Sequence, residues 1–131
     1  MGTKITGVIF TDLGRGAAFM ALEWVQQSLR EGLGFVPYPA TLNLRPESES
    51  EIAAWREVKK EMSGISITSP DPLFCQARCF LVDIEGQVKG AVLLPGVEGY
   101  PVDKIEVIAP VRLKDALRLR DGEKITLEFK D

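Results

Sequence analysis

The sequence predicts a mostly β (α+β) fold, built as a small, closed or partly closed β-barrel. Short runs rich in β-branched and aromatic residues recur along the chain, and turn residues separate them. One longer segment, residues 19–33, instead carries apolar side chains at helical spacing. The chain has 131 residues and no linker-like tract. We therefore expect residues 1–131 to form a single domain around one core.

The first part of the chain alternates extended and helical segments. Residues 3–11 are mainly β-branched and aromatic, which predicts a strand that ends at the loop of residues 12–16. Four apolar residues share one face of the helix predicted for residues 19–33, and Gly34 follows its end. Extended structure resumes at residues 42–44.

Residues 46–62 form a second helical candidate. Ser48 and Glu51 have the spacing of a capping box, in which each side chain accepts the backbone N–H of the other residue. Apolar residues that include Trp55 mark one face, and the rest of the segment is strongly charged. We interpret this segment as a surface insertion or embellishment of the barrel.

The second part of the chain contains the remaining strands. Glu85 and Gly86 mark a turn, Pro110 can start a short helix that runs through Leu117, and Gly122 suits a left-handed turn position. Strands are predicted within residues 63–71 and at residues 74–84, 88–94, 105–108 and 124–129.

The composition excludes several kinds of chemistry. The chain has no histidine, which removes the Ser-His-Asp and Cys-His arrangements and nearly all protein zinc sites. Cys75 and Cys79 are the only cysteines, and we expect both to be reduced. A net charge of −3 disfavours nucleic acid as a partner. Without a transmembrane-length apolar run or a signal-peptide pattern, we expect a cytoplasmic protein that does not bind membranes.

Residues 33–45 are rich in proline and end in a hydroxyl and an amide placed two residues apart. Strand side chains alternate between the two faces, so Thr41 and Asn43 would share a face. Hard oxygen ligands that project together can hold Mg²⁺ beside a phosphate group. The alternative is that both side chains bond only to nearby backbone in a loop, and the spacing alone favours that interpretation.

Residues 12–16 join the first strand to the first helix. The glycines at positions 14 and 16 would let backbone N–H groups approach a phosphate, and Arg15 can clamp an anion. The alternative for a Gly-x-Gly in a loop is a tight turn without a ligand.

Three separated motifs occur in one order along the chain. They are the loop of residues 12–16, the segment GFVPYPATLN at 34–43, and the run EVIAP at 106–110 with LRDG at 119–122. Together they resemble the motifs of the archaeal-type CTP-dependent riboflavin kinases over nearly the whole chain. The resemblance implies a six-stranded cradle-loop β-barrel with one longer helix and short peripheral helices.

The resemblance also implies a reaction, in which the phosphoryl group of CTP is transferred to riboflavin with the help of Mg²⁺, giving FMN and CDP. It assigns Gly14, Arg15 and Gly16 to the nucleotide, Thr41 and Asn43 to the metal, Tyr100 to the substrate, and Glu106 to catalysis. Glu106 would take the proton of the ribityl 5′-hydroxyl group. The alternative for Glu106 is that strand alternation turns its side chain toward solvent.

The chain departs from the family pattern around these residues. Asp12 stands where a glycine is usual, and Ala40 precedes Thr41 where the family has glycine. An Arg-Thr-His-Tyr-like run is reduced here to Tyr100, and Glu98 adds a negative charge beside it. Two hypotheses follow: a riboflavin kinase, or a non-catalytic, divergent member of the family that binds a flavin, a nucleotide or another small ligand.

Overall fold

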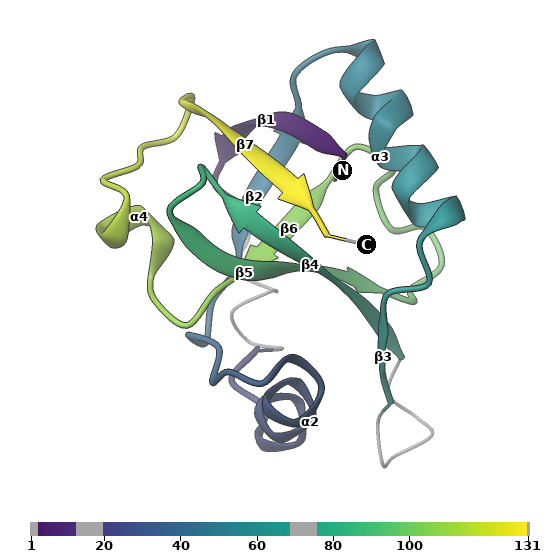
Figure 1. Ribbon diagram of the computed structural model, residues 1–131, viewed down its shortest axis with the longest axis vertical. Coiled ribbons are helices and arrows are strands. Elements are labelled where there is room, and N and C mark those ends of the chain that lie inside the picture. The colour runs from purple at the N-terminus through teal and green to yellow at the C-terminus, as the bar shows by residue number, and fades with distance from the viewer. Residues whose placement is uncertain (1–2, 13–19, 69–75, 131) are drawn as a thin grey trace.

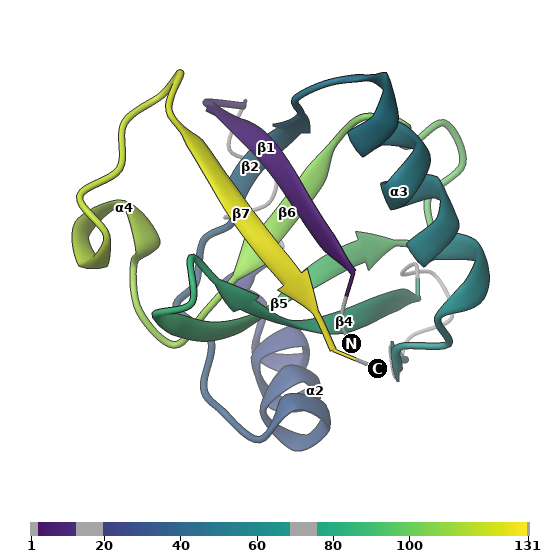
Figure 2. The ribbon, with the colours of Figure 1, turned by 45° about the horizontal axis from the view of Figure 1, so that its top comes forward.

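The computed structural model describes residues 3–12, 20–68 and 76–130, and its centre is a closed antiparallel β-barrel (Figures 1 and 2). The ring follows the order β1 (Lys4–Phe10), β2 (Leu42–Pro46), β6 (Ile105–Ile108), β5 (Val88–Pro95), β4 (Ala77–Ile84) and β7 (Lys124–Phe129). Pairing of β7 with both β4 and β1 closes the ring. The predicted six-stranded barrel is therefore confirmed, and β3 (Ile65–Ile67) adds a strand beside β4.

Three helices lie around the barrel in the described part of the chain: α2 (Glu23–Leu33), α3 (Glu49–Glu61) and α4 (Leu113–Ala116). Helix α2 ends where the sequence predicts, because Gly34 takes a left-handed conformation with φ 79° and donates its N–H to the carbonyl of Arg30. The predictions for Gly14, Arg15 and Gly16 lie outside the described residues.

Helix α3 belongs to the barrel core rather than to a surface embellishment. The Trp55 side chain is fully buried, and its ring centroid lies 6.0 Å from that of Phe80 and 5.9 Å from that of Phe129. The predicted capping box is wrong, since Ser48 makes no side-chain cap bond. Glu51 instead accepts the backbone N–H of Thr6 at 2.9 Å, which fastens the helix to β1.

The turns confirm the sequence predictions at two places. Glu85 and Gly86 both have positive φ, 53° and 65°, in the three-residue loop that joins β4 to β5, where Gln87 donates its N–H to the carbonyl of Ile84. Gly122 has φ 91° before β7, a conformation that side chains other than glycine rarely adopt.

The outer face of β4, β5 and β6 carries a second apolar cluster, which packs against α2. Val25 and Leu29 of α2 share this cluster with Cys79, Leu93 and Ile108 of the three strands, and Figure 1 shows α2 lying beside the barrel on this side. Cys79 is a free thiol, as predicted, and burial raises its pKa to about 12. The barrel wall is thus buried on both sides here, and Glu106, the polar residue of β6, lies on the same outer face as Ile108.

Candidate active site

The strand pair β2–β6 brings the predicted metal ligands and the predicted base together. Asn43 lies directly opposite Glu106 in the antiparallel register, so both side chains leave the same face of the sheet. Thr41, just before β2, donates its hydroxyl to Glu106 Oε1 over a long 3.5 Å. The alternating residues of both strands point into the barrel core: Leu42, Leu44, Ile105 and Val107.

Glu106 is buried, with only 4% of the residue exposed. Its Oε2 atom accepts a hydrogen bond from the Tyr100 hydroxyl at 2.7 Å, and its Oε1 atom lies 3.7 Å from the Lys104 ammonium. Burial and the bond to Glu106 raise the pKa of Tyr100, which keeps this hydroxyl protonated as a donor. The interpretation that Glu106 faces solvent is therefore wrong, because neighbours from other segments cover its strand.

Asn43 presents a buried oxygen atom without a partner. Its Oδ1 atom makes no hydrogen bond in the described structure, although a buried acceptor left unpaired is costly. Thr41 bonds a residue 65 positions away rather than nearby backbone, which argues against the local-loop interpretation. Two neutral oxygens beside the same carboxylate, one of them unpaired, fit a hard cation that takes its other ligands from phosphates and water.

The backbone around these ligands accommodates the alanine that replaces the family's glycine. Glu85 and Arg118 are the non-glycine residues with positive φ in the described part of the chain, so Ala40 is not strained in this way. Described residues also contain no group of three or more Cys, Asp or Glu side chains that could hold a metal by themselves. A metal at Thr41 and Asn43 would complete its coordination with water or with phosphate oxygens.

Lys104 and Asp12 are site residues that the sequence analysis missed. The Lys104 ammonium forms an ion pair with Asp12 and lies near Glu106, and its side chain is only 14% exposed. Asp12, which stands where the family usually has glycine, thus has its charge paired. Lys104 precedes Glu106 by two residues in an extended segment, so strand alternation is the signal that indicates a shared face.

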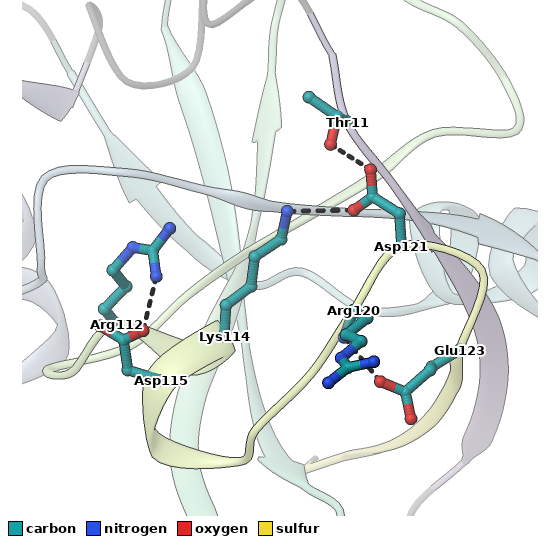
Figure 3. A network of polar contacts seen from close by, with 7 residues as sticks. All are labelled: Thr11, Arg112, Lys114, Asp115, Arg120, Asp121 and Glu123. Carbon is teal, nitrogen blue, oxygen red and sulfur yellow. Dashed lines mark hydrogen bonds and ion pairs between the residues drawn. The ribbon is translucent and has the colours of Figure 1, made fainter.

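Thr41 also lines a hollow of about 120 Å³. Residues of the proline-rich segment and of the α4 region line it, among them Tyr38, Arg112 and Lys114. Lys114 donates to Asp121 at 3.0 Å, and Asp121 also accepts from Thr11 at the end of β1 (Figure 3).

Arg112 makes its own pair with Asp115 at 2.7 Å, also in Figure 3. Two cations, Arg112 and Lys114, thus border a cavity that Thr41 also lines.

Fold and site together define a β-barrel domain whose outer face carries a buried carboxylate and two neutral side-chain oxygens, with cations nearby. The family model CTP-dep_RFKase, described as "Domain of unknown function DUF120", matches residues 9–129. The chain therefore belongs to this family, the CTP-dependent riboflavin kinases, and the resemblance expected from its motifs is confirmed.

Curated relatives agree with the family. The chain is 39% identical over 128 residues to the riboflavin kinase of Pyrobaculum calidifontis, covering 95% of this chain and 59% of the relative. It is 38% identical over 128 residues to that of Archaeoglobus fulgidus, covering 95% and 54%. It is 36% identical over 129 residues to that of Methanococcoides burtonii, covering 98% and 57%. The chain thus spans a little over half the length of these relatives.

Helices in the described ranges include none with the length and apolar character needed to cross a membrane.

Proposed function

We propose that this domain transfers the γ-phosphoryl group of CTP to the 5′-hydroxyl of riboflavin, producing FMN and CDP. The observation that carries the proposal is the buried Glu106 carboxylate, which lies opposite Asn43 and beside Thr41. The relatives named riboflavin kinase supply the acceptor, and the family name supplies the donor.

Glu106 acts as the general base in this proposal. The 5′-oxygen of riboflavin forms a bond to the γ-phosphorus while the bond from that phosphorus to the β–γ bridging oxygen breaks. The hydroxyl proton moves to the Glu106 carboxylate, and the electron pair of the broken bond leaves with CDP. The hydrogen bond from Tyr100 to Oε2 fixes the carboxylate, which leaves Oε1 on the side of Thr41. Positioning of this kind supplies much of the catalysis in phosphoryl transfer.

Thr41 and Asn43 would hold Mg²⁺ through their side-chain oxygens. When bound, the ion offsets the negative charge of the donor phosphates. The unpaired Oδ1 atom of Asn43 supports this role, because a cation would satisfy it. Serving as neutral ligands, the two side chains leave the ion most of its positive charge.

The two sides of Glu106 differ in a way that suits two substrates. Arg112 and Lys114 give positive charge to the hollow beside Thr41, which supports an anionic donor there. On the side of Oε2, the loop that carries Tyr100 also carries two exposed apolar side chains, Val97 and Val102, which supports an apolar flavin ring. Binding of the nucleotide by residues 14–16, binding of substrate by Tyr100, and a cytoplasmic location remain predictions.

One assay tests the proposed function. The purified chain is incubated with riboflavin, Mg²⁺ and either CTP or ATP, and FMN and the nucleoside diphosphate are separated by chromatography. We expect FMN with CTP in equal amount to CDP, and no product when EDTA replaces Mg²⁺. Absence of FMN with both donors, together with quenching of riboflavin fluorescence on binding, would instead identify the non-catalytic member of the family.

A further inference from the structure

We infer that Lys104 is a positioning residue that holds the Glu106 carboxylate in place as the base and keeps it out of the coordination shell of a cation at Thr41. The inference rests on the proposed function, since it assigns Glu106 the role of base. Its contacts, however, are a property of the described structure and can be tested without turnover.

Three segments of the chain fix the Lys104 side chain. Its ammonium pairs with Asp12 beyond the end of β1, lies 3.7 Å from Oε1 of Glu106 in β6, and sits 5.6 Å from the ring centroid of Tyr100. Only 14% of the side chain is exposed. A lysine side chain has several rotatable bonds, so contacts on three sides are needed to hold its charge at one point.

Two carboxylates share the Lys104 ammonium, those of Asp12 and Glu106. Among the described residues, Lys104 is the only cation that forms an ion pair with Glu106. Arg45, a neighbouring cation of β2, pairs instead with Asp103 at 3.6 Å and covers the ring of Phe10. A buried carboxylate that loses its partner is strongly destabilised and seeks another positive charge.

The same oxygen of Glu106 faces both Lys104 and Thr41. Oε1 lies 3.7 Å from the Lys104 ammonium and 3.5 Å from the Thr41 hydroxyl. A cation bound by Thr41 and Asn43 would therefore compete with Lys104 for this oxygen. With Lys104 present, the carboxylate is held by an ammonium and remains available to accept a proton. Without Lys104, the carboxylate becomes a third ligand, which tightens metal binding and removes the base.

The test replaces Lys104 and measures turnover and metal affinity separately. Lys104→Met keeps the long stem and removes the charge, and Lys104→Arg is the conservative variant. Lys124→Met is the matched control, because Lys124 is also ion-paired, with Glu47, but its side chain is 60% exposed. The measurements are kcat and KM for riboflavin, and titration calorimetry with Mn²⁺ as the probe, without riboflavin or nucleotide.

For Lys104→Met we expect a fall in kcat of about tenfold or more, a change in riboflavin KM of less than about threefold, and Mn²⁺ affinity raised about tenfold. In Lys104→Arg, kcat and Mn²⁺ affinity stay within about threefold of the wild type. Lys124→Met leaves kcat and Mn²⁺ affinity unchanged. A merely structural role for Lys104 would not tighten metal binding while slowing transfer.

Asp12→Asn shows whether Asp12 acts through Lys104. In the wild-type background it gives a smaller fall in kcat than Lys104→Met, and in the Lys104→Met background it adds nothing further. Independent, additive losses would overturn the connection between the two residues.

The inference and the proposed function can fail separately. If the wild type forms no FMN with either donor, the proposed function fails, and the Mn²⁺ titration alone decides the inference. Mn²⁺ affinity that is unchanged or weaker in Lys104→Met, or no Mn²⁺ binding by either protein, overturns it. Should the Met variant not fold by circular dichroism, Lys104→Gln takes its place in the same measurements.

Discussion

The inner and outer faces of the β2–β6 strand pair differ in the kind of side chain that they bury. The inner face contributes only aliphatic side chains to the barrel core, whereas the outer face carries Asn43 and Glu106 in direct register. Both faces are largely shielded from water, but only the outer one buries polar atoms. Since such burial lowers stability unless partners offset it, the difference indicates that the outer face is organised for binding and chemistry rather than for stability.

The partners of the outer face show how this burial is tolerated. Glu106 has a hydrogen-bond donor on one oxygen and an ammonium near the other. Asn43 is left with an unpaired Oδ1 atom. The inner face buries no polar side chain in this strand pair: Leu44 and Ile105 are fully buried among other apolar side chains. The following predictions separate the two faces experimentally, beginning with the largest effect.

The largest expected effect is on kcat, from Glu106→Gln on the outer face. Because the amide keeps the shape and an oxygen but cannot accept the proton, we expect kcat for FMN formation to fall by about 10²–10⁴-fold. The circular dichroism spectrum stays that of the wild type. Glu51→Gln is the control, as Glu51 accepts a backbone N–H far from the site, and it should keep kcat. Undiminished turnover in Glu106→Gln would remove its role as the base.

Leu44→Ala breaks the inner face. It leaves a cavity in the barrel core, so we expect the free energy of unfolding to fall by about 2–5 kcal/mol, measured by urea denaturation. The folded fraction should still turn over at the wild-type kcat. Leu81→Ala is the control, because Leu81 is an exposed apolar residue of β4. A loss of kcat in folded Leu44→Ala as large as that of Glu106→Gln would show that the two faces are not separate.

Asn43→Leu, on the outer face, should have the smallest effect on stability, and it should stabilise the protein where Leu44→Ala destabilises it. It removes the unpaired buried acceptor, so we expect the free energy of unfolding to rise by about 1 kcal/mol in EDTA. The response of FMN formation to Mg²⁺ should be lost at the same time. Asn43→Asp, which keeps an oxygen ligand, should retain that response. A clear loss of stability in Asn43→Leu would mean that this side chain is well satisfied in the native protein.

Local pattern explains why much of the fold could be predicted from the sequence. The bounds of β6 and β7 agree with those expected, and the end of α2 at Leu33 is set by a glycine directly after it. Hairpin and turn positions follow from Gly86 and Gly122, because glycine has no Cβ and adopts positive φ without strain. The predicted capping box of Ser48 and Glu51 is wrong. The Glu51 side chain accepts the backbone N–H of Thr6, a residue far away in the sequence.

The candidate site, like the fold, was predicted in part from local sequence, and the rest depends on the tertiary structure. Sequence alternation by itself placed Thr41 and Asn43 on one strand face, and the resemblance of the motifs to the riboflavin kinases added Glu106 to the same site. Only the tertiary structure decided that Glu106 is buried and that Lys104 pairs with Asp12, a residue 92 positions away. Closure of the barrel brings these segments together, and the covering of its outer face removes water from them. A strand's period of two specifies the face of a side chain, whereas burial and partners depend on segments far away in the chain.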